Sequence, residues 1–356
     1  MLGRRAAALC LTPLAAVVRA VAGRRRRLAR SDVRLPVRVV SVGNLVVGGV
    51  GKTPIVARLA GSLQKRGYSV GVVTGAYGAR PARREAADGH RFRCDIVTSA
   101  DMPHDAATRV GDETVMLAEA LPNVPIAAGR PKARAAEWLA ANADLDIIVV
   151  DDGFQHHALA RDIDIVLLDA RRPFGDGRVL PAGRLREGPE ALRDADIVVL
   201  TGHGEATDIA AARERVGTFA PQALVLTGKH VAVRARREPA GEPLDLEELA
   251  GARVLGVCGV GSPRSFERTL RELGADAEMM RYRDHHAYTD GDFRRVDARA
   301  EGRLVVTTAK DATKWRGRVG LPYVVIDVEM RLSDPKTLVD RILAAPPGQG
   351  GADVPT

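Results

Sequence analysis

The residues best suited to chemistry form a glycine-rich loop that ends in a lysine and a threonine. The loop comprises Val46, Val47, Gly48, Gly49, Val50, Gly51, Lys52 and Thr53. Glycines let successive backbone N–H groups turn inward around a phosphate, while the lysine reaches the terminal phosphates of a nucleotide and the threonine hydroxyl reaches Mg²⁺. The strict motif has glycine where Val46 stands, so this loop is a variant. We expect it to bind a purine nucleoside triphosphate with Mg²⁺.

A pair of aspartates follows an apolar run further along the chain. Residues 147–152 read IIVVDD, which ends in Asp151 and Asp152. An apolar strand that ends in aspartate places a carboxylate at the metal of a phosphate-binding site. A strand followed by an ordinary acidic turn has the same pattern, but the phosphate loop makes the metal site the better interpretation. We therefore expect Asp151 and Thr53 to be metal ligands.

Two further polar clusters contain residue types that suit proton transfer. Asp112 and Glu113 open a predicted helix after Gly111, and Asp284-His285-His286 follows a predicted strand in the second half of the chain. A positioned carboxylate or imidazole accepts a proton in general base catalysis. Taken singly, each cluster is more typical of a helix cap or a solvated loop.

The elements that must position these groups alternate between strands and helices. Short apolar runs bounded by Asp and Gly suit strands that are buried on both faces of a parallel sheet. Apolar positions that recur at helical spacing predict the helices between them. The first part of the chain has predicted strands at 37–42, 68–74, 145–150, 163–168 and 195–200, and predicted helices at 52–66, 113–121 and 132–141. This alternation predicts an α/β fold.

A second α/β pattern occupies the C-terminal part of the chain. Predicted strands at 253–258, 277–281, 303–308 and 323–327 alternate with predicted helices at 264–273, 290–300 and 334–344. Residues 223–236 contain two strand-like pieces, which we interpret as the link between the two units. The predicted organisation is an N-terminal helix within 1–30, a P-loop NTPase-type parallel-sheet domain over 31–222, a smaller α/β domain over 223–345, and a disordered Pro/Gly-rich tail over 346–356.

The N-terminal segment is apolar and then basic. Residues 6–23 contain Pro13 and Arg19, which argue against a membrane-spanning helix, and Arg24 to Arg27 follow directly. This basic cluster opposes translocation, so a secretory signal peptide is not favoured. We predict a membrane-associated helix that lies in the inner leaflet, with its arginines on anionic head groups. The alternative is an ordinary buried terminal helix.

The composition narrows the classes of protein. The 356 residues are 46% hydrophobic and 28% charged, which suits about two packed domains. A net charge of +8 favours an anionic ligand, although this arginine-rich composition also fits a GC-rich genome. Aromatic residues make up only 4%, so we expect no nucleic-acid partner. Three scattered cysteines form neither a disulfide framework nor a zinc motif, and a reducing compartment fits them.

The ordered set of motifs resembles the tetraacyldisaccharide 4'-kinase family, the lipid A 4'-kinases. The matching segments are SVGN at 41–44, GGVGKTP at 48–54, VGDE at 110–113, DDGFQH at 151–156, LPAGRLRE at 180–187, DHH at 284–286 and TAKDATK at 308–314. The resemblance covers about residues 10–344. It is specific, because DDGFQH and LPAGRLRE together are not general features of phosphate-loop proteins.

The resemblance implies transfer of the γ-phosphoryl of ATP to the 4'-hydroxyl of an acylated glucosamine disaccharide 1-phosphate, which gives lipid IVA. It implies ATP and Mg²⁺ as cofactors and the cytoplasmic face of a bacterial inner membrane as the location, and we predict no protein partner. Lys52, Asp151 and Asp152 match catalytic positions, and Asp112 matches a catalytic aspartate paired with His285. Further matching site positions are Asn44, Glu113, Gln155, His156, Arg186 and Glu187.

Two departures from the family and two alternatives stay open. The family's R-G-Y-G and T-E-K-D patterns read TGAYG at 74–78 and TAKD at 308–311, so an Arg and a Glu are missing. His286 stands next to His285, which leaves the catalytic histidine ambiguous by one residue. The rival function is a deviant P-loop ATPase or GTPase that acts as a switch or a metal-insertion factor. Such proteins usually carry a second lysine at the position of Val47, which is absent here.

Overall fold

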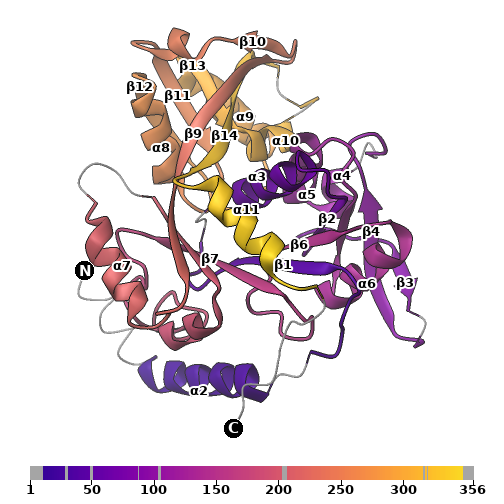
Figure 1. Ribbon diagram of the computed structural model, residues 1–356. Helices are drawn as coiled ribbons and strands as arrows, with labels where there is room; N and C mark the ends of the chain where they lie inside the picture. The colour runs from indigo at the N-terminus through magenta and orange to yellow at the C-terminus, as the bar shows by residue number, and fades with distance from the viewer. Residues whose placement is uncertain are drawn as a thin grey trace.

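The computed structural model describes residues 11–28, 31–48, 51–86, 88–102, 106–202, 207–315, 317–318 and 320–347. Two α/β lobes stand one above the other and are joined by two long strands (Figure 1). The described residues contain one sheet of 14 strands that runs through both lobes. The predicted α/β fold with a phosphate-loop domain and a second α/β unit is therefore confirmed.

The first domain is a mostly parallel sheet with the strand order β8-β7-β1-β6-β2-β5, extended by antiparallel β4 and β3. The strands are β1 (Arg38–Asn44), β2 (Val70–Thr74), β3 (Arg83–Glu85), β4 (Arg91–Val97), β5 (Ile126–Arg130), β6 (Ile147–Asp151), β7 (Ile163–Asp169) and β8 (Ile197–Thr201). Residues of β2, β6 and β8 are buried throughout, as expected for strands covered on both faces. Val42 pairs with Asp151, so the ends of β1 and β6 lie together at one edge.

Helices cover both faces of this sheet because its apolar side chains alternate between two cores. Val40 and Val149 join the core beneath α3 (Lys52–Gln64) and α5 (Asp112–Ala120), whereas Val39 and Val150 join the core beneath α6 (Lys132–Asn142). The remaining first-domain helices are α4 (Ala106–Val110), the 3-10 helix η1 (Pro189–Asp194) and α7 (Ile209–Gly217). The sequence pattern did not predict β3, β4, β5, α4 and α7. Of these, β4 reads RFRCDIV and alternates between exposed and buried residues over its first four positions, so its signal was present but was not used.

The second domain repeats the architecture on a smaller scale. Its strands are β11 (Arg253–Cys258), β12 (Asp276–Arg281), β13 (Leu304–Thr308) and β14 (Tyr323–Leu332), in the parallel order β12-β11-β13-β14. Its helices are α8 (Pro263–Glu272), α9 (Asp290–Ala300) and α10 (Ala309–Trp315), and β10 (Glu242–Leu244) and η2 (Leu246–Leu249) complete it. Helix α10 directly follows β13 and packs against α5 of the first domain. This contact positions the active site described below.

The link between the domains is one long strand and its antiparallel partner. Strand β9 (Leu224–Glu238) pairs with β8 in the first domain through Leu224–Thr227 and with β14 over Gly228–Glu238. The two strand-like pieces predicted for residues 223–236 are thus one continuous strand. After β14 the chain returns to the first domain, where α11 (Pro335–Ala344) packs with Leu338 and Ile342 in the core beneath α3. The predicted second unit, 223–345, includes this helix, whereas in the structure it packs on the first domain.

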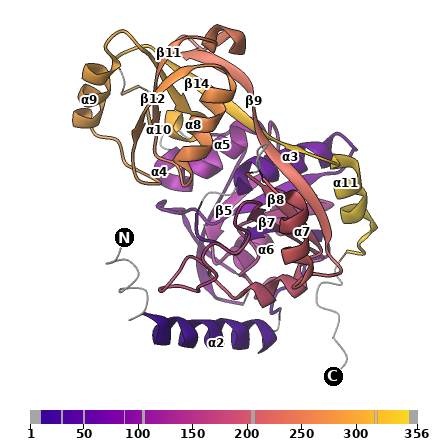
Figure 2. The same ribbon diagram turned by 90° about the vertical axis from the view of Figure 1, so that its left-hand side faces the viewer.

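Helix α2 (Thr12–Leu28) lies along the edge of the first domain that is farthest from the second domain (Figures 1 and 2). Ala15 is buried, while Leu11, Leu14, Val17, Val21 and Leu28 expose 37–65% of their surface. Among the described residues no helix has the length and apolar character needed to cross a bilayer. Residues 1–10 of the predicted N-terminal segment, and 348–356 of the predicted tail, lie outside the described part of the chain.

Candidate active site

The phosphate loop connects the end of β1 to the start of α3. Gly51 precedes α3 with a φ of 87°, and Gly48 has a φ of 131°, both values that favour glycine. The N–H of Val47 donates to the carbonyl of Arg184 at 2.8 Å, and Val46 forms a bridge with Leu185. The LPAGRLRE segment therefore supports the phosphate loop from outside. Gly49 and Val50, two predicted members of the loop, lie outside the described residues.

Lys52 and Thr53 open α3 and line a cavity between the domains. The ammonium of Lys52 donates to Asn44 Oδ1 at 3.2 Å and lies 3.4 Å from Asp152 Oδ1. Asn44 is fully buried at the end of β1, and its own amide donates to the carbonyl of Val46. Asn44 and Asp152 thus hold the lysine beside the phosphate loop.

Asp151 and Asp152 follow β6 and have opposite electrostatic surroundings. Asp152 adopts a φ of 53°, and Arg186 Nη1 lies 2.9 Å from both of its carboxylate oxygens. Burial alone would favour the neutral acid, yet the charges of Lys52 and Arg186 lower the pKa of Asp152 to about 2. Burial and the nearby charge of Glu113 instead raise the pKa of Asp151. A bound cation would reverse this shift.

The Asp151 carboxylate fits a divalent cation. Its Oδ1 is buried and has no hydrogen-bond partner among the described residues, which is a costly state for an oxygen that nothing coordinates. Thr53 lines the same cavity. The described residues contain no cluster of three or more His, Cys, Asp or Glu side chains of the kind that encloses a metal. This donor set suits Mg²⁺, which usually completes its shell with phosphate oxygens and water.

Lys132, which no sequence pattern predicts as a site residue, supports the turn that contains Asp151 and Asp152. Its side chain is only 2% exposed, and its ammonium donates to the backbone carbonyls of Asp151 and Asp152, to the latter at 2.8 Å. Burial lowers the pKa of Lys132. A lysine at the start of a predicted helix gave no signal in the sequence, because helix starts are usually exposed.

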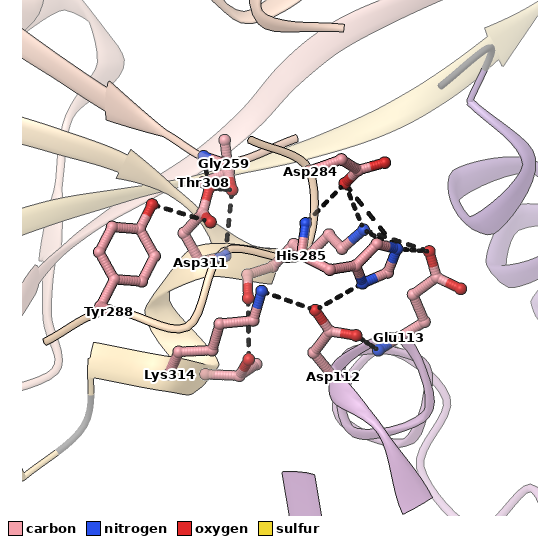
Figure 3. A network of polar contacts seen from close by, with 11 residues as sticks. Asp112, Glu113, Gly259, Asp284, His285, Tyr288, Thr308, Asp311 and Lys314 are labelled. Carbon is pink, nitrogen blue, oxygen red and sulfur yellow. Dashed lines mark hydrogen bonds and ion pairs between the residues drawn. The ribbon is translucent and has the colours of Figure 1, made fainter. Parts of the chain in front are cut away.

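Asp112 and His285 meet across the domain interface. Asp112 opens α5, is 7% exposed, and accepts the N–H of Glu113 through Oδ1 at 3.0 Å. Its Oδ2 lies 3.3 Å from His285 Nδ1 (Figure 3). His285 and Glu113 line the cavity between the domains, whereas Asp112 is in contact with His285 and is not among the lining residues. The interaction with Asp112 raises the pKa of His285, against the effects of burial and of the Lys310 charge.

The structure separates the two neighbouring histidines. His285 has a φ of 57°, which turns its ring toward Asp112. His286 points into the second domain, where its Nε2 lies 3.1 Å from Asp292 Oδ2 and its ring stacks on Tyr282 at 4.6 Å. His285 is therefore the histidine at the site, and His286 holds the start of α9.

Two lysines of α10 join the same network. Lys314 Nζ lies 2.9 Å from Asp112 Oδ2, and Lys310 Nζ lies 3.2 Å from Glu113 Oε1. Both lysines stand in the TAKDATK segment, to which the resemblance gives no separate role for either of them. Their spacing of four residues places them on one face of a helix, and this spacing is the sequence feature that could have predicted a shared role.

Gln155, His156 and Glu187 are the remaining predicted site positions. They do not all lie at the phosphate loop. Gln155 donates to the carbonyl of Asn44 at 3.0 Å and accepts from Arg186, close to the phosphate loop. His156 is partly buried, and burial lowers its pKa to about 4. Glu187 is paired with Arg26 of α2 at 2.7 Å and lies 3.7 Å from His157. It therefore anchors the N-terminal helix to the domain.

An arginine from another strand contacts the segment in which the family arginine is missing. Arg130, at the end of β5, donates to the carbonyl of Gly75 and lies 4.0 Å above the ring of Tyr77. Gly75 and Tyr77 line the cavity together with Lys132. A guanidinium group thus stands beside this segment despite the departure in sequence.

Both domains contribute to the cavity, which has a volume of about 480 Å³. A second cavity of about 810 Å³ shares Val47 and Gly48 with it. Arg171, Arg172, Arg184, Arg264 and Arg281 line this second cavity, against Asp169 and Asp176. The combined space is basic and suits anionic ligands.

A phosphate loop with a metal-fitting aspartate, faced by an aspartate–histidine pair that needs both domains, defines a phosphotransferase of the P-loop kinase class. The sequence profile of the tetraacyldisaccharide-1-P 4'-kinases matches residues 7–346. The chain belongs to this family.

Individual relatives agree with this assignment. The tetraacyldisaccharide 4'-kinase of Syntrophus aciditrophicus is 37% identical over 334 residues, which are 89% of this chain and 86% of the relative. That of Anaeromyxobacter dehalogenans strain 2CP-C is 41% identical over 288 residues, which are 78% and 72% of the two chains. The crystal structure of LpxK from Aquifex aeolicus in complex with ATP superimposes with a TM-score of 0.71 at 26% identity, over 94% of this chain and 99% of that one.

The predicted activity is confirmed by these matches. The chain is an ATP-dependent tetraacyldisaccharide 4'-kinase of lipid A biosynthesis. The alternative of a P-loop switch or metal-insertion factor is not favoured, because the match extends through both domains.

Proposed function

We propose that phosphoryl transfer takes place in the cavity between the domains, with the Asp112–His285 pair as the general base. The observation that carries the proposal is the 3.3 Å approach of Asp112 Oδ2 to His285 Nδ1 beside a cavity that also contains Lys52. The 4'-hydroxyl oxygen forms a bond to the γ-phosphorus of ATP, and the bond from that phosphorus to the β–γ bridging oxygen breaks. ADP leaves, and the hydroxyl proton passes to the pair.

Lys52 neutralises charge on the transferred group. In the structure it is held by Asn44 and Asp152, and Arg186 shares the Asp152 carboxylate. A nucleotide would draw Lys52 toward its phosphates, while Arg186 stays on Asp152 as the remaining counter-charge. Asp151 and Thr53 would hold Mg²⁺, which supplies charge neutralisation to the phosphates. The phosphate loop thus binds ATP without help from Asp112 or His285.

The two-domain construction limits wasteful hydrolysis of ATP. His285 and Asp112 belong to different domains, so the base is complete only when α10 and α5 are in contact. The chain passes between the domains only through β9 and β14 in the described residues, and these two strands pair with each other. A change in the angle between the domains would therefore bend this pair of strands. Closure after both substrates bind would assemble the base and exclude water in one step.

Product analysis tests this proposal. Labelled ATP and tetraacyldisaccharide 1-phosphate are incubated with the full chain, and the bis-phosphorylated lipid is measured. We expect Asp112→Asn to abolish most lipid phosphorylation while ATP still binds with unchanged affinity. Full activity of folded Asp112→Asn would exclude the aspartate as part of the base.

We further propose that α2 binds the cytoplasmic face of a bacterial inner membrane, where the acylated substrate resides. Leu14, Val17 and Val21 form an exposed apolar stripe, and Arg24, Arg25 and Arg27 are exposed beside it. The opposite face of α2 is held on the protein through Arg19 and Arg26, so the stripe points outward. Each basic residue near an anionic surface contributes about 1 kcal/mol of binding free energy.

Vesicle sedimentation tests the membrane proposal independently of catalysis. Val17→Asp with Val21→Asp should sharply reduce binding to vesicles that contain anionic lipid. Ala16→Asp with Ala20→Asp is the matched control, because these positions are exposed on the same helix beside the stripe. Equal binding of both double variants would show that the apolar stripe is not the membrane contact.

A further inference from the structure

The lysine-bearing face of α10 is directed at the catalytic pair. Lys314 Nζ lies 2.9 Å from Asp112 Oδ2, as Figure 3 shows, and Lys310 Nζ lies 3.3 Å from His285 Nε2. The two side chains are only 15% and 13% exposed. Long lysine side chains are rarely so enclosed without a partner, and each of these reaches one end of the Asp112–His285 pair.

Helix α10 stands on a rigid support. Asp311 is fully buried, and its carboxylate accepts the Gly259 N–H at 3.0 Å, the Thr308 hydroxyl at 2.8 Å and the Tyr288 hydroxyl at 3.1 Å (Figure 3). Trp315 is fully buried one residue after Lys314. Each anchor directly follows one of the two lysines in the sequence, so Lys310 and Lys314 are held on the same fixed helix.

The contact with Lys310 favours one tautomer of the neutral histidine. An ammonium group has only donors, so the tautomer that suits Lys310 is the one in which His285 Nε2 is the acceptor. The proton of the neutral imidazole is then on Nδ1, which faces Asp112 Oδ2. Asp284 Oδ1, 3.1 Å from Lys310, helps to hold that ammonium in place.

The Asp112 carboxylate is approached from both domains. His285 Nδ1 and Lys314 Nζ lie 3.3 Å and 2.9 Å from Oδ2 as ion-pair partners, and the N–H of Glu113 donates to Oδ1. One group of its own helix and two groups of the second domain therefore hold this carboxylate.

We propose that Lys310 and Lys314 are positioning residues of the kinase. Lys314 holds the Asp112 carboxylate and Lys310 keeps the proton of His285 on Nδ1, so that the pair stays oriented as one base for the sugar proton. Neither lysine touches a reacting atom, and both act only while α10 is docked on α5. This inference rests on the proposed role of the Asp112–His285 pair.

The dependence of kcat on pH is sensitive to the contacts between Asp112 and the two lysines. Asp112 faces three positive or ionisable groups of the second domain, His285, Lys310 and Lys314, and Glu113 of its own helix. Despite the opposing effect of burial, these contacts hold the pKa of Asp112 well below its usual range. Removing a lysine raises that pKa, and because the base must be deprotonated, the acid limb of the kcat profile moves to higher pH.

The test compares Lys314→Met and Lys310→Met with Lys65→Met, which removes an exposed lysine at the end of α3. A positioned general base contributes about 10²- to 10⁴-fold to rate, so a residue that acts through it should cost less, about 10- to 100-fold in kcat. KM for ATP should not change. Lys314→Arg should restore the acid limb because it keeps the charge. Lys314→Gln is the second neutral variant should Lys314→Met not fold.

A double-mutant cycle decides whether the lysines act through the pair. In an Asp112→Asn background, Lys314→Met should cause no further loss of kcat. An equal loss in both backgrounds, or an unshifted acid limb, would overturn the inference while leaving the base assignment intact. Full activity of Asp112→Asn itself would instead overturn the proposed base.

Discussion

Replacing Arg26 by methionine should detach α2 from the first domain. The guanidinium lies 2.7 Å from Glu187 and 2.7 Å from Asp194, donates to the Phe154 carbonyl at 3.3 Å, and sits 4.3 Å above the Phe154 ring. The Arg26 and Glu187 side chains are each 9% exposed. Methionine keeps the apolar stem and removes all the polar contacts.

The magnitude follows from the burial of the pair. Removing one partner of a buried ion pair costs about 3–5 kcal/mol, because the other charge stays buried. Glu187 retains His157 at 3.7 Å, so we take the lower value of about 3 kcal/mol. The loss lowers the free energy with which α2 docks on the first domain and does not affect the sheet. It corresponds to about a 100-fold rise in the fraction of molecules in which α2 is detached.

Hydrogen exchange of the α2 amides is the direct assay. Arg26→Met should accelerate their exchange by about two orders of magnitude and leave β1 and β6 unchanged. The control is Arg27→Met, one residue along at an exposed position. Similar exchange of α2 in both variants would refute the claim that Arg26 holds the helix.

The same anchor should weaken in acid. Although burial opposes ionisation, His157 and Arg26 keep the pKa of Glu187 below its usual value. Its stabilising effect is therefore fully present above about pH 4.3, the ordinary value for glutamate, and is lost as pH falls through the lowered pKa. After correction for intrinsic rates, α2 exchange should accelerate below that pH, and in Glu187→Gln it should be fast throughout.

Three further outcomes follow from the site. Lys52→Ala should lower kcat by about 10²- to 10³-fold in single-turnover assays, since a preorganised charge at the transferred group is lost; near-normal turnover would remove the phosphate loop from the mechanism. Asp112→Asn and His285→Gln should be strongly non-additive in kcat, with binding of ATP retained, because the two residues act as one unit; additive losses would mean separate roles. Lys132→Met should leave the two backbone carbonyls that this lysine pairs unsatisfied, which costs about 1–3 kcal/mol for each in denaturant unfolding; an unchanged unfolding free energy would contradict the bracing role.

The N-terminal helix illustrates where sequence and structure divide. Its apolar and basic residues predicted a helix, and α2 is one. The sequence did not show that Arg19 and Arg26 turn toward the protein, whereas Arg24, Arg25 and Arg27 remain exposed. Which arginine is an anchor depends on where Glu187 and Glu190 lie in the folded domain, and residue type alone does not contain that information.

Local chemistry and the order of elements were readable from the sequence alone. The phosphate loop between a strand and a helix, the aspartates after an apolar run, and the family motifs each depend on neighbouring residues. Backbone geometry forces such neighbours together, so the strand, the loop and α3 could be predicted with nearly correct bounds. The family assignment, and with it the reaction, followed from the same short segments.

The tertiary structure alone decided which distant groups cooperate. In the structure, His285 rather than His286 contacts Asp112, Lys310 and Lys314 contact that pair, and Glu187 pairs with Arg26 instead of lining the cavity. Periodicity reports how one element is buried, but contacts between domains depend on how two surfaces meet. The docking of α10 on α5, set by the paired strands β9 and β14, is a property of the whole fold, and the completed base exists only there.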